Sequence, residues 1–468
     1  MDRVLILIIM MIVIFIWLSK DGLRLSYAKF TEALVTIFVF SCCFTRLNIP
    51  FYSLPYEHQY GPFGAAFRIE VYHVFMLILL WIVAQRTNLK FNAVKKSVVL
   101  AIIFYLFYTV LNPYNVVKAS SFIALNYFIT YVVFLYLLVN CCSVETLIKG
   151  VYNGLCITIV FQLILVLAFA LTRSYAIVRL FNADAITRRG VSPGSFGHPN
   201  ALGAYMSFCL MFFVSCYVTK FRQKDSAIYA VLAIAIIIMS ASRSALLACA
   251  FGIVVIVVMY VFRRYSIFNA KILLQGVLPI SIALLLAYNF TPLGDMFGAS
   301  SDADDMVIAR YMHYYCAYEI FEDHPLIGVG LNSHLRYLQD NSALVDIETM
   351  FEGLDIWLPE DFMFHNPIHN IWLIMLTEFG IIGVIPILCF IVYYFVTFKK
   401  KIRNSNSKYY NISAISGLGI LSYMFVHGNT DWALYTPTML NISLLFLYVS
   451  ETKQYSLACN ENELLENE

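Results

Sequence analysis

Long runs of apolar residues alternate with short polar stretches along almost the whole chain. Clear examples lie at 4–18, 71–83, 122–139, 157–171, 227–239 and 371–396. A run of roughly 20 apolar residues spans a bilayer as an α-helix, which satisfies its own backbone hydrogen bonds there. The pattern therefore predicts an all-α polytopic membrane protein with about 12–13 transmembrane helices. The spans are expected at 3–19, 29–45, 69–85, 97–113, 120–140, 150–172, 198–219, 226–241, 243–262, 272–290, 367–397, 410–427 and 432–450.

The composition agrees with a membrane protein. Of the 468 residues, 61% are hydrophobic and 13% are charged, against about 25% charged in an average soluble domain. Most of the 11 cysteines lie within apolar runs, so they are expected to pack as small apolar residues. The sequence has no Gly-rich nucleotide cradle after a strand pattern, which argues against nucleotide-driven transport.

The basic residues are concentrated in alternate loops, as they are when short cytoplasmic loops retain Lys and Arg. The basic loops contain Lys20, Arg24, Lys29, Arg86, Lys90, Lys95, Lys96, Lys149, Lys220, Arg222, Lys224, Arg263, Arg264, Lys271, Lys399, Lys400, Lys401, Arg403 and Lys408. These loops are predicted to be cytoplasmic. The two long connections at 173–197 and 291–366 then face the periplasm or the cell exterior.

This orientation divides the chain into five parts. They are N-terminal transmembrane helices at 1–172, central transmembrane helices with an outer Arg-rich loop at 173–290, a large outer loop with amphipathic helices at 291–366, C-terminal transmembrane helices at 367–450 and an acidic cytoplasmic tail at 451–468.

The predicted outward loops use arginine almost exclusively as their cation. Their cations are Arg46, Arg68, Arg173, Arg179, Arg188, Arg189, Arg243, Arg310, Arg336 and the single lysine Lys118. Control of topology would accept either residue, whereas the planar guanidinium makes bidentate contacts with phosphate or carboxylate. An anionic ligand on the outer face is therefore expected. For any one of these residues, a structural salt bridge is the alternative.

The outer segment 188–200 combines two arginines with a Gly- and Pro-containing turn back into the membrane. His198 and Asn200 stand at the entrance of the next helix, where they can form hydrogen bonds. Arg188 and Arg189 lie just before the turn. All four are expected to bind substrate; a plain turn with two interfacial arginines is the alternative.

Two further arginines lie at the same boundary. Arg243 belongs to a very short turn between two apolar helices, where an unpaired charge is costly and an anionic partner is favourable. Its alternative is to reach the lipid head groups. Arg310 belongs to an amphipathic helix predicted over 305–321, with His313 one turn beyond it. Such a helix would also suit the membrane interface without any catalytic role.

The densest cluster of polar groups is the segment 365–370, which leads directly into a long predicted span. Asn366 is expected to cap that helix, Pro367 to occupy its first position and His369 its first turn. A helix N-terminus disfavours a protonated imidazole and attracts anions. A neutral His369 can then accept a proton from a sugar hydroxyl beside a bound phosphate. A structural histidine, or a metal held by His365 and His369, is the alternative.

With these segments identified, the chain resembles the O-antigen ligase and polymerase superfamily of bacterial surface polysaccharide assembly. His369-Asn370, nine residues, Gly380, two residues and Gly383 are similar to the ligase-type motif of His, a small polar residue, nine positions, Gly, two positions and a small residue. Three more segments look like blocks of that family: 194–203, 242–244 and 310–330. The blocks cover the second half of the chain well, whereas the first six spans match only in being hydrophobic.

The resemblance implies a membrane-embedded, metal-independent glycosyltransferase of GT-C-like architecture that uses no cofactor. It would take glycan from an undecaprenyl-pyrophosphate carrier in the cytoplasmic (inner) membrane, with its active site facing the periplasm or exterior. The resemblance further implies that Arg189, Arg243 and Arg310 hold the pyrophosphate, while His369 activates the acceptor hydroxyl. His369 and Arg310 are the implied catalytic residues. The implied substrate-binding residues are Arg188, Arg189, Arg243, Asn370, His365, His198 and Asn200.

The acceptor distinguishes a polymerase from a ligase, because it is another carrier-linked repeat unit in one case and a lipid A core in the other. The chain is long, highly aromatic and unlike the family outside the blocks, which favours a polymerase. A ligase, a protein O-glycosylating enzyme and a polytopic transporter or flippase for lipid-linked sugars stay open as alternatives. A transporter should place ionisable residues deep within its spans, whereas the candidates here lie at the outer boundary. The expected partners are the lipid-linked oligosaccharide, membrane lipid, and chain-length regulator and flippase proteins, without nucleic acid.

Overall fold

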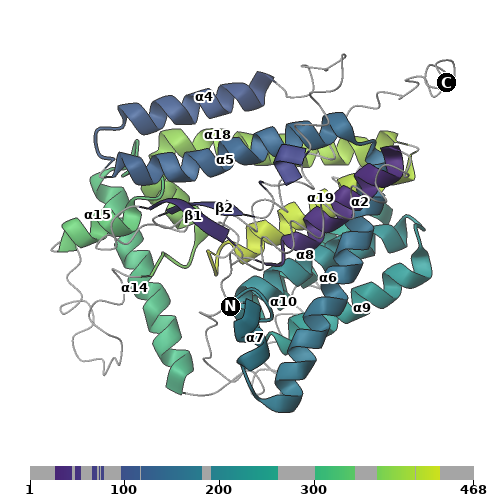
Figure 1. The fold of residues 1–468 in the computed structure, drawn as a ribbon. Helices are drawn as coiled ribbons and strands as arrows, with labels where there is room; N and C mark the ends of the chain where they lie inside the picture. Colours follow the sequence, from purple (N-terminus) through teal and green to yellow (C-terminus); the bar gives the residue numbers. More distant parts are fainter. Residues whose placement is uncertain are drawn as a thin grey trace.

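The computed structural model describes residues 27–44, 48–53, 66–70, 73, 75–78, 96–115, 117–181, 191–261, 301–342, 366–405 and 407–432. Within these residues the chain is mainly helical (Figure 1). The helices are α2 Tyr27–Ser41, α4 Lys96–Leu111, α5 Lys118–Cys141, α6 Val144–Thr172, α7 Ala176–Phe181, α8 Pro199–Val218, α9 Gln223–Met239, α10 Arg243–Val261, α14 Ser301–Asp323, α15 His334–Asp340, α18 Ile371–Asn404 and α19 Lys408–His427. Two short strands accompany them, β1 Asn48–Ser53 and β2 Ala66–Glu70.

Nine of the predicted spans are helices in the structure, each within several residues of its expected position. The agreement is closest for α10, expected at 243–262 and observed at Arg243–Val261. Among the described helices, four are long and apolar enough to cross a membrane: Val144–Thr172, Pro199–Val218, Arg243–Tyr260 and Ile371–Asn404. The prediction of an all-α polytopic membrane protein is confirmed. The expected spans at 3–19, 272–290 and 432–450, and most of 69–85, lie outside the described residues, so the total of about 12–13 spans stays a prediction.

A small β-hairpin, which the apolar pattern did not predict, lies against α5. β1 and β2 pair antiparallel, with Ile49 opposite Ile69. Tyr127 of α5 bonds to the backbone of β2: its hydroxyl accepts from the Arg68 amide at 3.0 Å and donates to the Ala66 carbonyl at 3.2 Å. Strand edges need such partners wherever water is scarce. The contact with α5 therefore stabilises the hairpin.

α19 lies between two groups of helices (Figure 1). α4, α5 and α18 run across the top of the view, and α2, α6, α8, α9 and α10 form the body below. α19 contacts α18 on one side and α8 and α10 on the other. It therefore connects the two groups, and its ends lie next to the ends of α8, α10 and α18.

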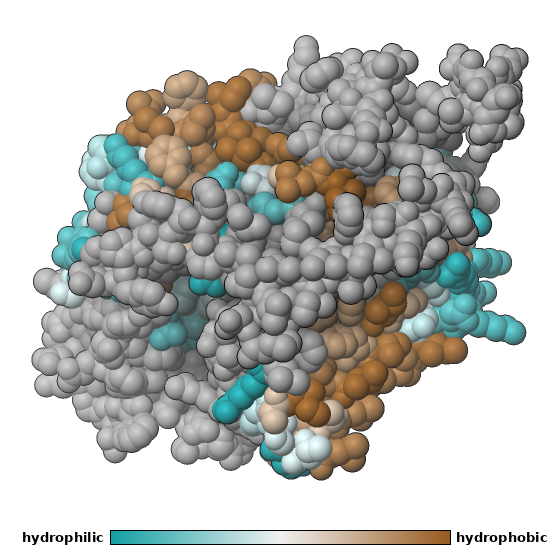
Figure 2. Space-filling model, viewed as in Figure 1, coloured by the Kyte–Doolittle hydropathy of each residue, from teal (hydrophilic) through white to brown (hydrophobic). Residues whose placement is uncertain are grey.

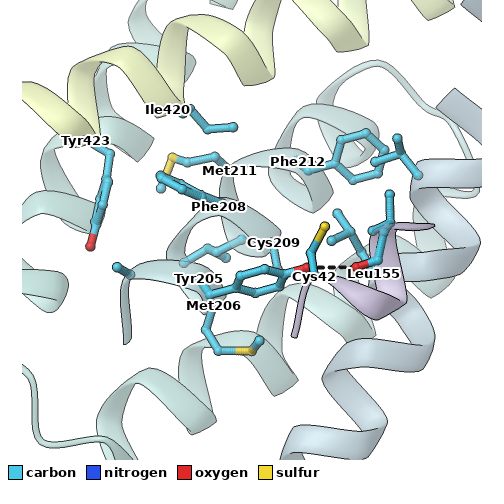
Figure 3. Packing of buried hydrophobic residues seen from close by; sticks show 14 of the residues in the cluster. Cys42, Leu155, Tyr205, Met206, Phe208, Cys209, Met211, Phe212, Ile420 and Tyr423 are labelled. Atoms are coloured by element: carbon cyan, nitrogen blue, oxygen red, sulfur yellow. Dashed lines mark hydrogen bonds between the residues drawn. The ribbon is translucent and has the colours of Figure 1, made fainter. Parts of the chain in front are cut away.

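The core is densest around α8, whose side chains are buried on nearly every face. Phe208, Phe212 and Phe213 are among the largest fully buried side chains of the described residues, and Figure 3 shows part of this cluster. The Tyr205 hydroxyl donates to the Val39 carbonyl at 3.1 Å, which joins α8 to α2. Because α8 has neighbours on all sides, packing fixes where its N-terminus lies.

Apolar side chains are exposed on the outer faces of α4 and α18. Leu100, Phe107 and Leu111 of α4 are exposed, as are Ile385 and Val392 of α18. The brown area at the upper left of Figure 2 covers α4. Such an extended apolar surface is unfavourable in water, whereas lipid hydrocarbon is as apolar as leucine. These faces suit contact with lipid.

α2 packs closely on α6 at two glycines spaced four residues apart. A Cβ atom at Gly150 would lie 2.8 Å from the Glu32 carbonyl oxygen, and one at Gly154 would lie 2.7 Å from the Thr36 carbonyl oxygen. The Thr36 hydroxyl also donates to the Gly150 carbonyl at 3.2 Å. Small residues at this spacing let two helix backbones approach each other in a membrane. The pair Gly150 and Gly154 therefore sets the distance between α2 and α6.

Replacing Gly154 with alanine is expected to lower the free energy of unfolding by about 1–3 kcal/mol, because the new methyl group overlaps the backbone of α2. The measurement is the thermal midpoint of the purified protein in detergent. Ile164→Ala changes an exposed side chain of the same helix and serves as the control. Equal midpoints for Gly154→Ala and wild type would show that the close approach does not stabilise the fold.

The start of α18 differs from the prediction. Asn366 was expected to cap this helix, but the cap is Asn370, whose side-chain oxygen accepts from the Trp372 and Leu373 amides at 2.9 and 3.2 Å. Asn370 has extended backbone angles (φ −156°, ψ 113°), so the helix begins at Ile371. His369 thus lies immediately before the helix and not in its first turn. The prediction of Asn366 as the cap, with Pro367 at the first helical position, is wrong, because a second asparagine four residues later takes the capping role.

α18 is interrupted at Gly380, where the backbone leaves the helical region (φ 58°, ψ −173°). The segment 325–330 bonds to the interruption with its own backbone. The amide-to-carbonyl bonds are Val329 to Thr377 (2.9 Å), Gly330 to Glu378 (3.0 Å), Ile381 to Pro325 (2.9 Å) and Ile382 to Leu326 (3.0 Å). The Tyr108 hydroxyl of α4 contacts the Ile327 and Phe379 carbonyls at the same place. The backbone groups released by the break are therefore satisfied by the loop.

Candidate active site

Short turns bring several helix ends together at one end of the bundle. α8, α10 and α18 begin there, α9 and α19 end there, and α14 packs beside α18. Hydrogen bonds join these ends: Ser244 Oγ lies 3.4 Å from His427 Nε2, and the Asn200 side-chain amide donates to the Asp431 carboxylate. We call this region the mouth. It consists of residues 198–200, 240–244, 310–314, 366–370 and 427–431.

His369 lies in the mouth, directly before α18. Its ring stacks on that of His313 from α14, with centroids 4.9 Å apart and 19° between the ring planes. Burial lowers the pKa of His369 below its ordinary value. The Asp431 charge opposes this shift, while Arg310 and His198 add to it. The imidazole is therefore neutral near neutral pH, and this is the form that accepts a proton.

Asp431, in the turn after α19, interacts electrostatically with His369. It was not among the residues predicted from the sequence. Its carboxylate is buried, with 4% of the residue exposed, and accepts the hydrogen bond from Asn200. A carboxylate near an imidazole stabilises the ring once the ring has taken a proton. The available signal was position: Asp431 lies in the short connection between the predicted spans 410–427 and 432–450, where an acidic residue needs a partner.

Arg310 approaches the same point from α14, one helical turn before His313. Its side chain is half-buried, and its Nε atom has no hydrogen-bond partner among the described residues. Its charge lowers the pKa of both His313 and His369, which places it within electrostatic range of the two rings. A half-buried guanidinium with unused donor capacity is suited to an anionic ligand.

Arg243 is the first residue of α10 and is half-buried. Ser242 before it accepts a hydrogen bond from the Ala245 amide at 3.4 Å, and Ser244 after it reaches His427. The N-terminus of a helix carries partial positive charge and unpaired amides. The α10 terminus thus adds to the positive character of the mouth and places Arg243 at its edge.

The other described candidates hold helix ends in place. His198 Nδ1 accepts from the Asn200 amide at 3.1 Å and caps α8. The Asn370 side-chain amide donates to the Asn429 carbonyl at 3.3 Å, and the Tyr314 hydroxyl donates to the same carbonyl at 3.1 Å. These bonds position the mouth, and contact of His198, Asn200 and Asn370 with substrate stays a prediction. Three predicted residues lie outside the described part of the chain: Arg188, Arg189 and His365.

A buried pair of polar side chains lies next to the Gly380 break. His334 Nδ1 of α15 and Glu378 Oε1 of α18 are 2.7 Å apart, and both side chains are fully buried. The sequence showed Glu378 inside a predicted span but gave no partner for it. The pair joins α15 to α18, so the segment that contains α15 is attached to the bundle at a fixed point.

Residues 228–388 match the family model described as O-antigen ligase. Over this segment the chain is similar to the O-antigen ligase family. This match confirms the resemblance inferred from the sequence motifs. It supports an enzyme of the O-antigen ligase and polymerase type that acts in a membrane on lipid-linked polysaccharide, without distinguishing polymerase from ligase. None of the curated proteins matches the chain significantly.

The matched segment supplies most of the mouth. It runs from α9 into α18 and includes Arg243, Arg310 and His369. The start of α8 with Asn200 and the turn after α19 with Asp431 lie outside the matched residues, yet the fold brings them to the same place. The mouth is therefore built by the matched segment together with helices on either side of it in the sequence.

Proposed function

We propose that this protein is a polysaccharide polymerase that transfers glycan from an undecaprenyl-pyrophosphate carrier to a hydroxyl of another carrier-linked repeat unit. The observation that carries the proposal is that the buried imidazole of His369 lies in the mouth within electrostatic range of a cation, Arg310, and of a buried carboxylate, Asp431. His369 and Arg310 both lie within the residues that match the O-antigen ligase model. The combination offers a base, a site for phosphate and a group that stabilises the protonated base.

The reaction proposed is a single displacement at the anomeric carbon of the donor. The acceptor hydroxyl oxygen forms the new bond to that carbon while its proton passes to His369. The bond from the anomeric carbon to the pyrophosphate oxygen breaks, and its electron pair leaves with the carrier. Arg310 and Arg243 stabilise the charge that develops on the pyrophosphate, and Asp431 stabilises the protonated ring. The anomeric configuration is inverted, and the charge is stabilised without a metal.

The distribution of basic residues supports an outward-facing mouth. The end of the bundle opposite the mouth holds the turn after α8 and the turn before α19. Arg222 there lies over the Tyr152 ring at 4.9 Å, and Lys408 lies over the Tyr409 ring at 4.9 Å. Basic loops of this kind are retained on the cytoplasmic side. The mouth would then open to the periplasm or exterior of the cytoplasmic membrane.

The proposal requires two partners that act before and with the polymerase. A carrier-linked repeat unit made on the cytoplasmic side needs a flippase to reach an outward mouth. A polymerase that adds one unit after another needs a regulator to set the length of its product. The chain-length regulator and the flippase are therefore part of the proposal.

Deletion of the gene, followed by electrophoresis of surface glycan, tests the function and separates the two candidate acceptors. Loss of a polymerase should leave single repeat units attached to the core. Loss of a ligase should leave no attached glycan, with polymer accumulating on the carrier. The wild-type gene supplied in trans should restore the ladder. Unchanged glycan after deletion would contradict both assignments.

A further inference from the structure

His313 is a buried histidine of the mouth to which the reaction above gives no role. It is 1% exposed and lies three residues after Arg310 on α14, so the two side chains share one face of the helix. Its ring stacks on His369 with centroids 4.9 Å apart and an angle of 19°. It also contacts the backbone of Asn366, at the beginning of the segment that carries His369. His313 therefore touches this segment at two points.

The polar contacts of the His369 ring are few among the described residues. The ring contacts the backbone of Pro367, and its Nδ1 atom has no hydrogen-bond partner among the described residues. One polar contact leaves the plane of an imidazole ring free to turn, since the terminal torsion of histidine is broad. A second ring packed against its face removes that freedom. The stack with His313 thus restricts the plane of the His369 ring.

We propose that His313 is a positioning residue for His369. It holds the His369 ring in the orientation in which a ring nitrogen faces the acceptor hydroxyl, and it keeps water away from one face of that ring. The inference rests on the function proposed above, because it assumes that His369 is the base. It also explains how α14 acts as a unit. Arg310 on this helix would bind the pyrophosphate of the donor, and His313 on the same helix would set the orientation of His369.

The electrostatics fit a positioning role for His313. Burial lowers the pKa of His313 to about 3, with smaller effects from His369, His334 and Arg310. His313 therefore stays neutral near neutral pH. A neutral ring can act as a wall without competing for the proton. The charged and titratable groups acting on His369 are Asp431, Arg310 and His198, and none is altered by substitution of His313.

The test compares His313→Ala, which opens the face of His369, with His313→Phe, which keeps a ring there. In His313→Ala, kcat for transfer is expected to fall about tenfold to a hundredfold, the range set by a misplaced catalytic group. Water reaching the ring would weaken the burial that lowers the pKa of His369, so the acid limb of the pH profile should move to higher pH. His313→Phe should keep the wild-type limb and nearly the wild-type kcat.

Two controls make the outcomes distinct. Cys316→Ala removes another fully buried side chain of α14 and reports general loosening of the helix. The reactivity of His369 toward diethyl pyrocarbonate, followed by mass spectrometry against pH, needs no activity. It should rise in His313→Ala, with a higher midpoint, and stay at the wild-type value in His313→Phe.

The results that overturn the inference differ from those that overturn the proposed function. If His313→Ala leaves both the limb and the reactivity of His369 unchanged, or if His313→Phe behaves like His313→Ala, His313 does not position the base. If the wild type transfers no glycan, or His369→Asn transfers it normally, the function is wrong. The reactivity of His369 then still decides whether His313 shields the ring.

Discussion

Replacing His369 with asparagine is expected to reduce the rate of glycan transfer by about 10²–10⁴-fold, the usual contribution of a positioned general base. Asparagine keeps a polar side chain of similar size but cannot accept the hydroxyl proton. The neighbouring imidazole of His313 is a much weaker base, because burial lowers its pKa to about 3, so it should not replace His369. The measurement is the initial rate of glycan elongation by purified protein, at equal amounts of wild type and variant.

The matched control is His324→Gln. His324 is also a half-buried histidine, but it lies directly after α14, where it stacks on Tyr114 and bonds to Tyr337, away from the mouth. Its replacement should leave the rate within about threefold of wild type, as for a substitution outside the reacting groups. The assignment of His369 as the base fails if both variants keep the wild-type rate, or if both lose it together.

Replacing Gly380 with alanine is expected to destabilise the protein by about 3 kcal/mol or more, enough to lower its abundance in the membrane. The backbone at Gly380 has φ 58° and ψ −173°, a region open essentially only to glycine. A Cβ atom there would also lie 2.4 Å from the backbone carbon of Leu326. Neither α18 nor the segment 325–330 can move without losing the hydrogen bonds between them. The amount of folded protein after detergent extraction is the measurement.

Ile381→Ala is the control for the Gly380 substitution, because it changes an exposed side chain at the next position of α18. This variant should extract in wild-type amounts. Gly380→Ala protein that extracts and melts like wild type would show that α18 tolerates a continuous helix here. In that case the loop 325–330 would not depend on the break.

The positions of the helices could be predicted from the sequence because apolar length decides them. A stretch long enough to cross a bilayer must satisfy its own hydrogen bonds, so it becomes a helix wherever its neighbours are. α19, expected at 410–427 and observed at Lys408–His427, illustrates this. The start of α18 depends instead on which of two asparagines caps it. That choice is decided by contact with the turn after α19, where the Ile371 amide donates to the Gly428 carbonyl at 2.8 Å.

The break at Gly380 could not be predicted, because a single glycine within an apolar run is compatible with a continuous helix. What interrupts the helix is the segment 325–330, about fifty residues earlier in the chain, whose backbone occupies the gap. The β-hairpin was missed for a similar reason. Its strands are short, and their stability comes partly from Tyr127 of a distant helix.

The site was partly predictable because short turns force consecutive spans to alternate in direction. His369 and Arg243 were singled out at the ends of different spans, and alternation places those ends on one side of the bundle. The lateral arrangement of the helices was not predictable from one sequence. It brings Asp431 close to Asn200 and His313 against His369, contacts that join residues far apart in the chain.

The most direct test of the account is transfer by the purified protein in lipid nanodiscs, supplied only with undecaprenyl-pyrophosphate-linked repeat unit in the presence of EDTA. The account predicts that wild type lengthens the glycan and releases one undecaprenyl pyrophosphate for each new bond. Arg310→Ala should do so about 10²–10³-fold more slowly, as when a donor to a developing charge is removed. Lengthening that Arg310→Ala performs at the wild-type rate, or no lengthening by wild type, would contradict it.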